Sequence, residues 1–216
     1  MSFSMMLSQL SSGMVKTIGI FILTLLFSLP LGLLVSFGRM SKHFLLRTVT
    51  KIYISIMRGT PLMLQLMVVF YGPFYLWGAR LGNGYRFPAI IIGFVVNYAA
   101  YFAEIYRGGI QAIPKGQYEA AKVLGYTKAQ TFFRIVLPQV IKHITPAMGN
   151  EVITLVKDTS LVQVIGVSEL LRTAQTQSSR LFSTTPIFVA GVFYFVMNWV
   201  VSAFFNYLEK KLNYYK

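Results

Sequence analysis

Four long stretches of this sequence contain no charged residue, and they constrain the fold more than any other feature. They cover residues 18–38, 59–79, 87–103 and 181–208. A helix needs about 20 apolar residues to cross the hydrocarbon core of a bilayer, so each stretch is long enough, or nearly so, for one crossing. Charged residues make up 12% of the chain, whereas soluble domains carry about 25%. The sequence therefore predicts a helical membrane protein.

A fifth apolar region, residues 144–167, is interrupted by charges at Glu151, Lys157 and Asp158. We count it as a span. An ionisable group inside a membrane helix is rare, so these charges mark a candidate functional site. The predicted fold is an all-α membrane protein with five transmembrane helices, in a single domain that covers residues 1–216. The chain has no cysteine, which excludes disulfides and thiolate metal sites.

The basic residues fall in three blocks that alternate with the apolar stretches. The net charge is +14, which would also suit a nucleic-acid-binding protein. The blocks contain Arg39, Lys42, Arg47, Lys51 and Arg58; then Arg107, Lys115, Lys122, Lys128, Arg134 and Lys142; and finally Lys210, Lys211 and Lys216. Cytoplasmic loops of membrane proteins are rich in Lys and Arg, so this alternation indicates topology rather than a nucleic-acid partner. It predicts an outside N-terminus and a cytoplasmic C-terminus.

Residues 112–138 are predicted to form two short helices in the cytoplasm between the third and fourth spans. Pro114 and Gly116 break the helix of the third span, and residues 117–124 follow as a short helix. Gly125 suits the left-handed conformation just past a helix end.

The second short helix is predicted to start at a capping box. Thr127 is followed three residues later by Gln130, so that each side chain can bind the backbone N–H of the other. This helix carries the apolar residues Phe132, Phe133, Ile135 and Val136, and Pro138, which follows them, is expected to end it.

Three interpretations of this cytoplasmic loop compete. It is an ordinary surface loop, a DNA-binding helix-turn-helix, or a docking surface for a cytosolic partner. Close flanking by membrane spans argues against the DNA-binding module. Small side chains at Ala120 and Ala121 would let a partner approach closely, and Glu119 offers it a charge.

The loop resembles the EAA loop in permease subunits of binding-protein-dependent ABC importers. Its pattern is Glu119-Ala-Ala-x3-Gly125-x9-Ile135-x-Leu137-Pro138. Other motifs are similar to the polar amino acid uptake branch of that superfamily. In chain order they are Arg58-Gly-Thr-Pro61, Ala103-Glu-Ile-Tyr-Arg-Gly-Gly-Ile110, Ile113-x-x-Gly-Gln117, Lys157-Asp-Thr-Ser-Leu161 and Val164-Ile-Gly166.

The resemblance implies a type I ABC importer permease fold (MetI-like). It also implies that Glu119, Ala120, Ala121 and Gly125 couple the chain to an ATPase. The sequence has no Gly-x4-Gly-Lys-Ser/Thr phosphate loop. We therefore expect no enzyme activity and no cofactor in this chain, with ATP and Mg bound by a separate subunit.

The implied partners complete a transporter in the inner or plasma membrane of a prokaryote. They are two cytosolic ATPase subunits, a second permease subunit that is identical or a sister chain, an extracytoplasmic substrate-binding protein, and an amino acid substrate. Nucleic acid is not among them.

Polar side chains in the fourth span are candidates for binding the substrate. Glu151, Thr154 and Asp158 are spaced three and then four residues apart, so they share one face of a helix. Thr159 and Ser160 add hydroxyl groups, in a run that favours local unwinding of the helix within the membrane. The alternative is that the two acids form structural ion pairs, for example with a nearby lysine.

Asn97, in the third span, is a further candidate for substrate binding. Its alternative role is a hydrogen bond between helices. For Glu104 and Arg107, near the cytoplasmic end of the same span, an ion pair three residues apart or a bridge between subunits is expected rather than a contact with substrate.

Two acids on one face suit a substrate with an extra positive charge, such as arginine, lysine or histidine. We therefore predict ATP-driven import of a polar, basic L-amino acid by alternating access. One alternative is a secondary transporter that uses the buried carboxylates as ion sites, although five spans without a second repeat half would be unusual for it. Another is a docking protein with no pathway. The polar residues 168–180 are either a solvated extracytoplasmic connector or a contact for the binding protein.

Overall fold

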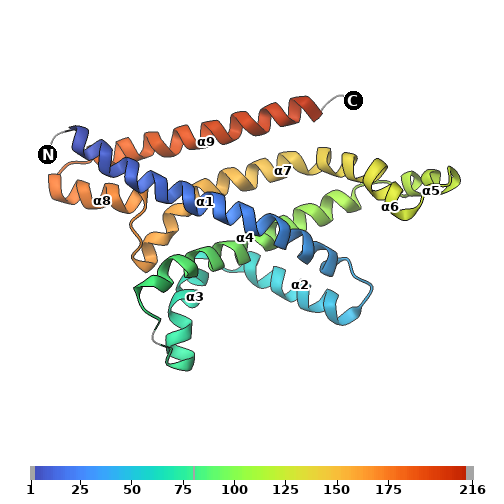
Figure 1. Cartoon of the computed structure of the whole chain (residues 1–216), viewed down its shortest axis with the longest axis horizontal. Coiled ribbons are helices and arrows are strands. Elements are labelled where there is room, and N and C mark those ends of the chain that lie inside the picture. The colour runs from blue at the N-terminus through green and yellow to red at the C-terminus, as the bar shows by residue number, and fades with distance from the viewer. Residues whose placement is uncertain (1–2, 80, 213–216) are drawn as a thin grey trace.

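The computed structural model describes residues 3–79 and 81–212, which form helices joined by short turns (Figure 1). The α-helices are α1 (Phe3–Arg39), α2 (Phe44–Gly59), α3 (Leu62–Trp77), α4 (Arg86–Gln111), α5 (Lys115–Val123), α6 (Lys128–Thr131), α7 (Leu137–Asp158), α8 (Leu170–Leu181) and α9 (Thr185–Leu212). Two 3₁₀-helices, η1 (Asn83–Tyr85) and η3 (Thr159–Ile165), and a π-helical turn, η2 (Phe132–Val136), complete the order. These two ranges contain no strand, and the predicted all-α class is confirmed.

Three helices of the described ranges, α1, α4 and α9, are long and apolar enough to cross a membrane. The pair α2 and α3 counts as a fourth at most, with a bend of 110° between its halves. α7 carries Glu151, Lys157 and Asp158 and is not among these helices. The predicted number of five spans therefore stays a prediction.

The second predicted span, residues 59–79, needs a correction. Its helix starts only at Leu62, and the basic segment before it is the helix α2 rather than a loop. Thr60 precedes Pro61 and has the extended backbone that proline favours in the residue before it, with φ −124° and ψ 149°. That local restriction breaks the helix at Thr60.

α1 and α4 cross at the centre of the bundle and approach each other closely (Figure 1). Small buried residues line one face of α1: Gly13, Thr17, Thr24, Ser28, Gly32 and Ser36. A methyl group added at Gly32 would lie 2.9 Å from Cβ of Phe102 and 3.0 Å from the carbonyl oxygen of Ala99. Small side chains allow such close packing of membrane helices, which is held by van der Waals contacts.

Side-chain amides hold the bend between α2 and α3. Nδ2 of Asn97, on α4, donates to the Met57 carbonyl (3.1 Å) and to Oε1 of Gln65 (2.9 Å). Gln65 donates in turn to the carbonyls of Met57 (3.0 Å) and Thr60 (3.1 Å). Carbonyls at a helix end lack intrahelical hydrogen-bond donors. Here the side-chain amides of Asn97 and Gln65 are the donors. Asn97 thus makes the interhelical hydrogen bond that was its alternative role.

A fully buried carboxylate, Glu169, joins α1, α8 and α9. It caps α8 by accepting hydrogen bonds of 2.8 Å from the N–H groups of Leu171 and Arg172. The hydroxyls of Tyr194 on α9 (2.7 Å) and Thr17 on α1 (3.4 Å) donate to the same carboxylate. The polar connector between the last two predicted spans is therefore a helix that is fixed to two others.

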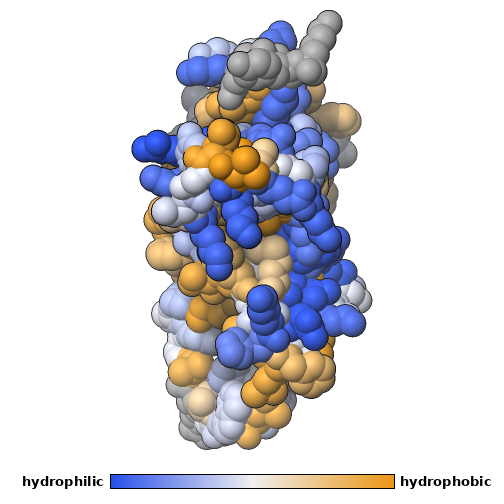
Figure 2. Space-filling view, turned by 90° about the vertical axis from the view of Figure 1, so that its right-hand side faces the viewer, coloured by the Kyte–Doolittle hydropathy of each residue, from blue (hydrophilic) through white to orange (hydrophobic). Residues whose placement is uncertain are grey.

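The segments that carry most of the basic residues gather at one end of the bundle, whereas Arg58, at the other end of α2, stacks on Tyr101. α1 and α9 end there, α2 begins there, and the turn between α5 and α6 lies there, at the right of Figure 1. Figure 2 views this end and shows hydrophilic residues over much of it. The gathering agrees with the topology that the positive-inside rule predicts. Lys216 lies outside the described residues.

Replacing Gly32 with alanine should weaken the packing of α1 on α4. We expect the free energy of unfolding to fall by about 1–3 kcal/mol, because the site has no room for a methyl group. Gly19→Ala, on the same helix, is the control, since a Cβ there meets nothing within 4 Å. Alanine is the better helix former by about 1 kcal/mol, so the control should be neutral or more stable. Denaturant unfolding in detergent compares them, and equal stability of the two variants would contradict the packing argument.

Candidate functional site

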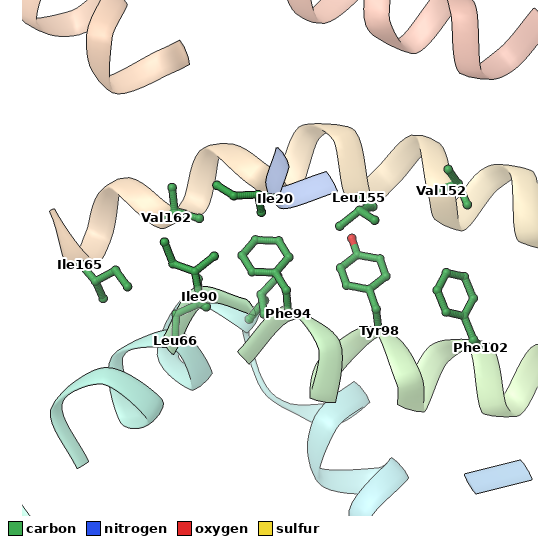
Figure 3. Close-up of a cluster of buried hydrophobic side chains, with 11 residues drawn as sticks. Ile20, Leu66, Ile90, Phe94, Tyr98, Phe102, Val152, Leu155, Val162 and Ile165 are labelled. Carbon is green, nitrogen blue, oxygen red and sulfur yellow. The ribbon is translucent and has the colours of Figure 1, made fainter. Parts of the chain in front are cut away.

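Two half-buried carboxylates on α7 form the centre of the candidate site. Asp158 is the last residue of α7, and its Oδ2 accepts a hydrogen bond of 2.7 Å from the hydroxyl of Tyr98. Figure 3 shows Tyr98 reaching from α4 toward α7, between Phe94 and Phe102. Glu151 lies seven residues earlier on α7, so the two acids are about 10 Å apart along the helix axis.

Neither acid has an ion-pair partner within residues 3–79 and 81–212. The ion pairs of these ranges both involve Glu104, with Arg107 at 2.5 Å and with Arg39 at 3.7 Å. The predicted pair between Glu104 and Arg107 is therefore confirmed. Lys157 is exposed and takes part in neither pair. Two half-buried negative charges without a bound cation on this helix make a site that favours a positively charged ligand.

Two cations lie in the surroundings of this pair, namely Lys157, which is next to Asp158 in the chain, and Arg58. Arg58, at the end of α2, stacks over the ring of Tyr101 at 5.3 Å from the ring centroid. Its charge attracts Glu151, while Asp158 repels that carboxylate. The two acids therefore have different electrostatic surroundings.

The predicted hydroxyl residues all bond to the backbone of their own segment. Thr154 donates to the carbonyl of Asn150 (3.0 Å), and Ser160 donates to the carbonyl of Lys157 (2.8 Å). Thr159 is fully buried and donates to the Val156 carbonyl at 2.6 Å. Each hydroxyl oxygen can still accept a hydrogen bond.

The predicted unwinding after Lys157 takes the form of a tighter helix. The α-helix changes at Thr159 into the 3₁₀-helix η3, which ends at Gly166 with φ 78°. A 3₁₀ turn is a common way for an α-helix to end. The backbone therefore changes its geometry directly beside Asp158.

Asn97 lies apart from the acids. Its amide faces α2 and α3, where it bonds to Met57 and Gln65, whereas the neighbouring Tyr98 faces α7. The structure thus brings Tyr98 and Asp158 together, and places Asn97 in the bend between α2 and α3. Its predicted contact with substrate stays a prediction.

The loop between α4 and α7 has the predicted helix–glycine–helix order. The first helix is α5, and Gly125 beyond it has φ 77°, in the left-handed region that favours glycine. Glu119 and Ala120 are exposed, whereas Ala121 is 1% exposed. A partner would therefore meet Glu119 and Ala120, while Ala121 holds α5 on its own chain.

The predicted capping box is present at the start of α6. Thr127 Oγ1 accepts from the N–H of Gln130 (3.2 Å), and Gln130 Oε1 accepts from the N–H of Thr127 (2.9 Å).

The predicted end of this second helix at Pro138 is wrong. Helical backbone continues from α6 through η2 into α7. Proline cannot donate to the carbonyl four residues earlier. The chain accommodates this in the wider π turn, where the N–H of Leu137 donates to the Phe132 carbonyl five residues back. Gln139 Nε2 also donates to the carbonyl of Ile135 at 2.8 Å.

Tyr98 was absent from the sequence-based site. It lies in an uncharged stretch, and its partner Asp158 is 60 residues away. One sequence signal could have found it, because tyrosines of membrane helices concentrate at the interfaces and Tyr98 lies in the middle of its span.

Comparisons with known proteins agree with the permease family that the loop motif predicts. Residues 28–214 match the family described as binding-protein-dependent transport system inner membrane component. Over 208 residues the chain is 38% identical to the L-cystine transport system permease protein TcyB of Bacillus subtilis (strain 168), covering 95% of this chain and 87% of the relative. It is 35% identical over 201 residues to the arginine transport system permease protein ArtQ of the same organism, covering 93% and 90%.

A solved structure extends the agreement to the fold. The crystal structure of an amino acid ABC transporter with histidines contains a chain with a TM-score of 0.85 and 33% identity, covering 98% of this chain and 99% of that one. The family predicted from the loop motif is therefore confirmed. The chain belongs to the family of inner membrane components of binding-protein-dependent transport systems.

Proposed function

We propose that this permease forms the pathway of an ATP-driven importer for a polar, basic L-amino acid. Family membership and the amino acid transport named for its relatives support the substrate class. The observation that carries the basic preference is the pair of half-buried acids, Glu151 and Asp158, without an ion-pair partner in the described residues. The ArtQ relative is named for arginine and the TcyB relative for cystine, so family membership alone does not decide which amino acid is transported.

In this proposal the substrate ammonium or guanidinium binds at Asp158. The Tyr98 hydroxyl already holds one carboxylate oxygen and fixes its direction. The second acid, Glu151, lies about 10 Å away along α7, a span that suits the two charged ends of an extended basic amino acid. Thr154, Thr159 and Ser160 supply hydroxyl oxygens beside the acids.

Transport requires partners that bind and hydrolyse ATP. We propose that two cytosolic ATPase subunits contact the loop through the exposed residues Glu119, Ala120 and Gly125, that the buried Ala121 holds α5 in place for this contact, and that the ATPase subunits hold ATP and Mg. A second permease subunit, identical or a sister chain, would complete the pathway. A binding protein would deliver substrate at the opposite end, where the N-terminus would lie. The family membership argues against the alternative of an ion-coupled secondary transporter.

Removing the charge of Asp158 or Glu151 should change selectivity. We expect Asp158→Asn and Glu151→Gln each to reduce uptake of the basic substrate by about tenfold or more, the effect of about 1.4 kcal/mol of lost binding. Uptake into proteoliposomes, competed with basic and neutral amino acids, measures this. Tyr98→Phe keeps the charge and should have a smaller effect. Unchanged uptake and selectivity in both acid variants would refute the substrate site. In the same assay, a change of selectivity in Asn97→Ala, rather than a loss of uptake alone, would place Asn97 in that site.

Enlarging Ala120 should block the contact through which the permease stimulates ATP hydrolysis. Ala120 is exposed on α5, so Ala120→Leu should leave the permease folded while its bulk blocks contact with the ATPase. We expect substrate-stimulated ATP hydrolysis of the assembled transporter to fall at least tenfold. Ala129→Leu is the matched control, because Ala129 is also exposed and lies on α6, outside the motif. Equal ATP hydrolysis in the two variants would argue against this coupling surface.

A further inference from the structure

We propose that the exposed face of α8, together with Phe182, is the surface that binds the substrate-delivering protein. The partner surface that fits it carries acidic side chains beside a small apolar pocket. This inference rests on the proposed function, which puts α8 outside the membrane, at the end opposite the coupling loop (Figure 1).

α8 has a buried face and an exposed face. Leu170, Ala174 and Gln177 are buried against the bundle, at positions i, i+4 and i+7. The exposed residues repeat the same spacing on the other side: Arg172, Thr176, Ser179 and Arg180. Together with Gln175 they line a shallow, polar groove of about 360 Å³. One side of α8 is therefore left exposed by residues 3–79 and 81–212.

The charge of this face is positive. Arg172 and Arg180 are eight residues apart, about 12 Å along the helix, and neither belongs to an ion pair of the described residues. The acid of this segment, Glu169, is buried and bonded to α8 itself. Extracytoplasmic loops are poor in arginine, so two exposed arginines on one outer helix are unusual there. A complementary partner presents carboxylates at matching separation.

Phe182 adds an apolar anchor beside the arginines. Its side chain is 97% exposed, and its backbone is left-handed, with φ 48° and ψ 40°. The other left-handed residues of the described ranges are glycines: Gly78, Gly125 and Gly166. Glycine or asparagine would close α8 with less strain. A strained, exposed aromatic side chain points to a functional constraint, and aromatic side chains dominate binding energy at protein interfaces.

The surroundings of Phe182 suit that role. Ser178, Ser179, Ser183 and Thr184 surround it in an open hollow of about 500 Å³. The Ser178 hydroxyl donates to the Ser183 carbonyl and closes the turn. The Glu169 carboxylate fixes the other end of α8 to α1 and α9. Docking on α8 therefore acts on two membrane helices at once.

Charge reversal on the assembled transporter tests the proposal. The transporter, with its ATPase, is reconstituted in neutral phosphatidylcholine nanodiscs, and ATP hydrolysis is titrated with the substrate-loaded cognate binding protein. We expect Arg172→Glu/Arg180→Glu to raise the half-saturating concentration of binding protein at least tenfold at low salt, with unchanged basal hydrolysis. Arg47→Glu, an exposed reversal on α2, is the matched control.

Phe182→Gly separates binding from folding. Glycine relieves the left-handed strain, so Tm should not fall, while the half-saturating concentration should rise at least fivefold. If the wild type responds to the binding protein and these variants respond equally well, the docking surface is refuted. A defect that appears only when anionic lipid is present would assign the arginines to lipid headgroups and also refute it. A wild type that no binding protein stimulates would instead refute the proposed function.

Discussion

The close approach of α1 to α4 is the contact on which the rest of this permease depends. Inside a bilayer, apolar side chains gain nothing by leaving lipid for protein, so helices must be held by shape and by polar pairs. The small residues of α1 bring its backbone against Ala99 and Phe102. α4 thereby becomes the central helix, with Phe94, Tyr98 and Phe102 buried along it. From α4, Asn97 then reaches α2 and α3, and Tyr98 reaches α7.

Polar groups inside the bundle fall into two kinds. Asn97, Gln65 and Glu169 bond to backbone or side chains of neighbouring helices, and these bonds fix the bend between α2 and α3 and the position of α8. Asp158 has a single side-chain donor, Tyr98, and remains half-buried. Asn97, Gln65 and Glu169 thus have their partners within the described residues, whereas a group kept for a ligand must leave some of its hydrogen-bonding capacity free.

The sequence predicted those features whose signal is local. The uncharged stretches correctly predicted that α1, α4 and α9 are helices long and apolar enough to cross a membrane. The Thr127–Gln130 capping box and the left-handed Gly125 were predicted from adjacent residues. Features that depend on distant partners were missed. Tyr98 pairs with a residue 60 positions away, and Glu169 binds Thr17 from 152 positions away. α2 was missed because its basic residues were read only as a topology signal.

The π turn before Pro138 has a mechanical consequence. Because helical backbone continues across it, the segment from the capping box at Thr127 to Asp158 is one rod, roughly 45 Å long at 1.5 Å per residue. One end of this rod adjoins α5, which carries residues proposed to contact the ATPase, and the other end carries Asp158, the carboxylate proposed to bind the substrate. A tilt imposed at the first end is passed to the second along continuous helical backbone, and the π turn and Pro146 are the points at which that backbone can bend.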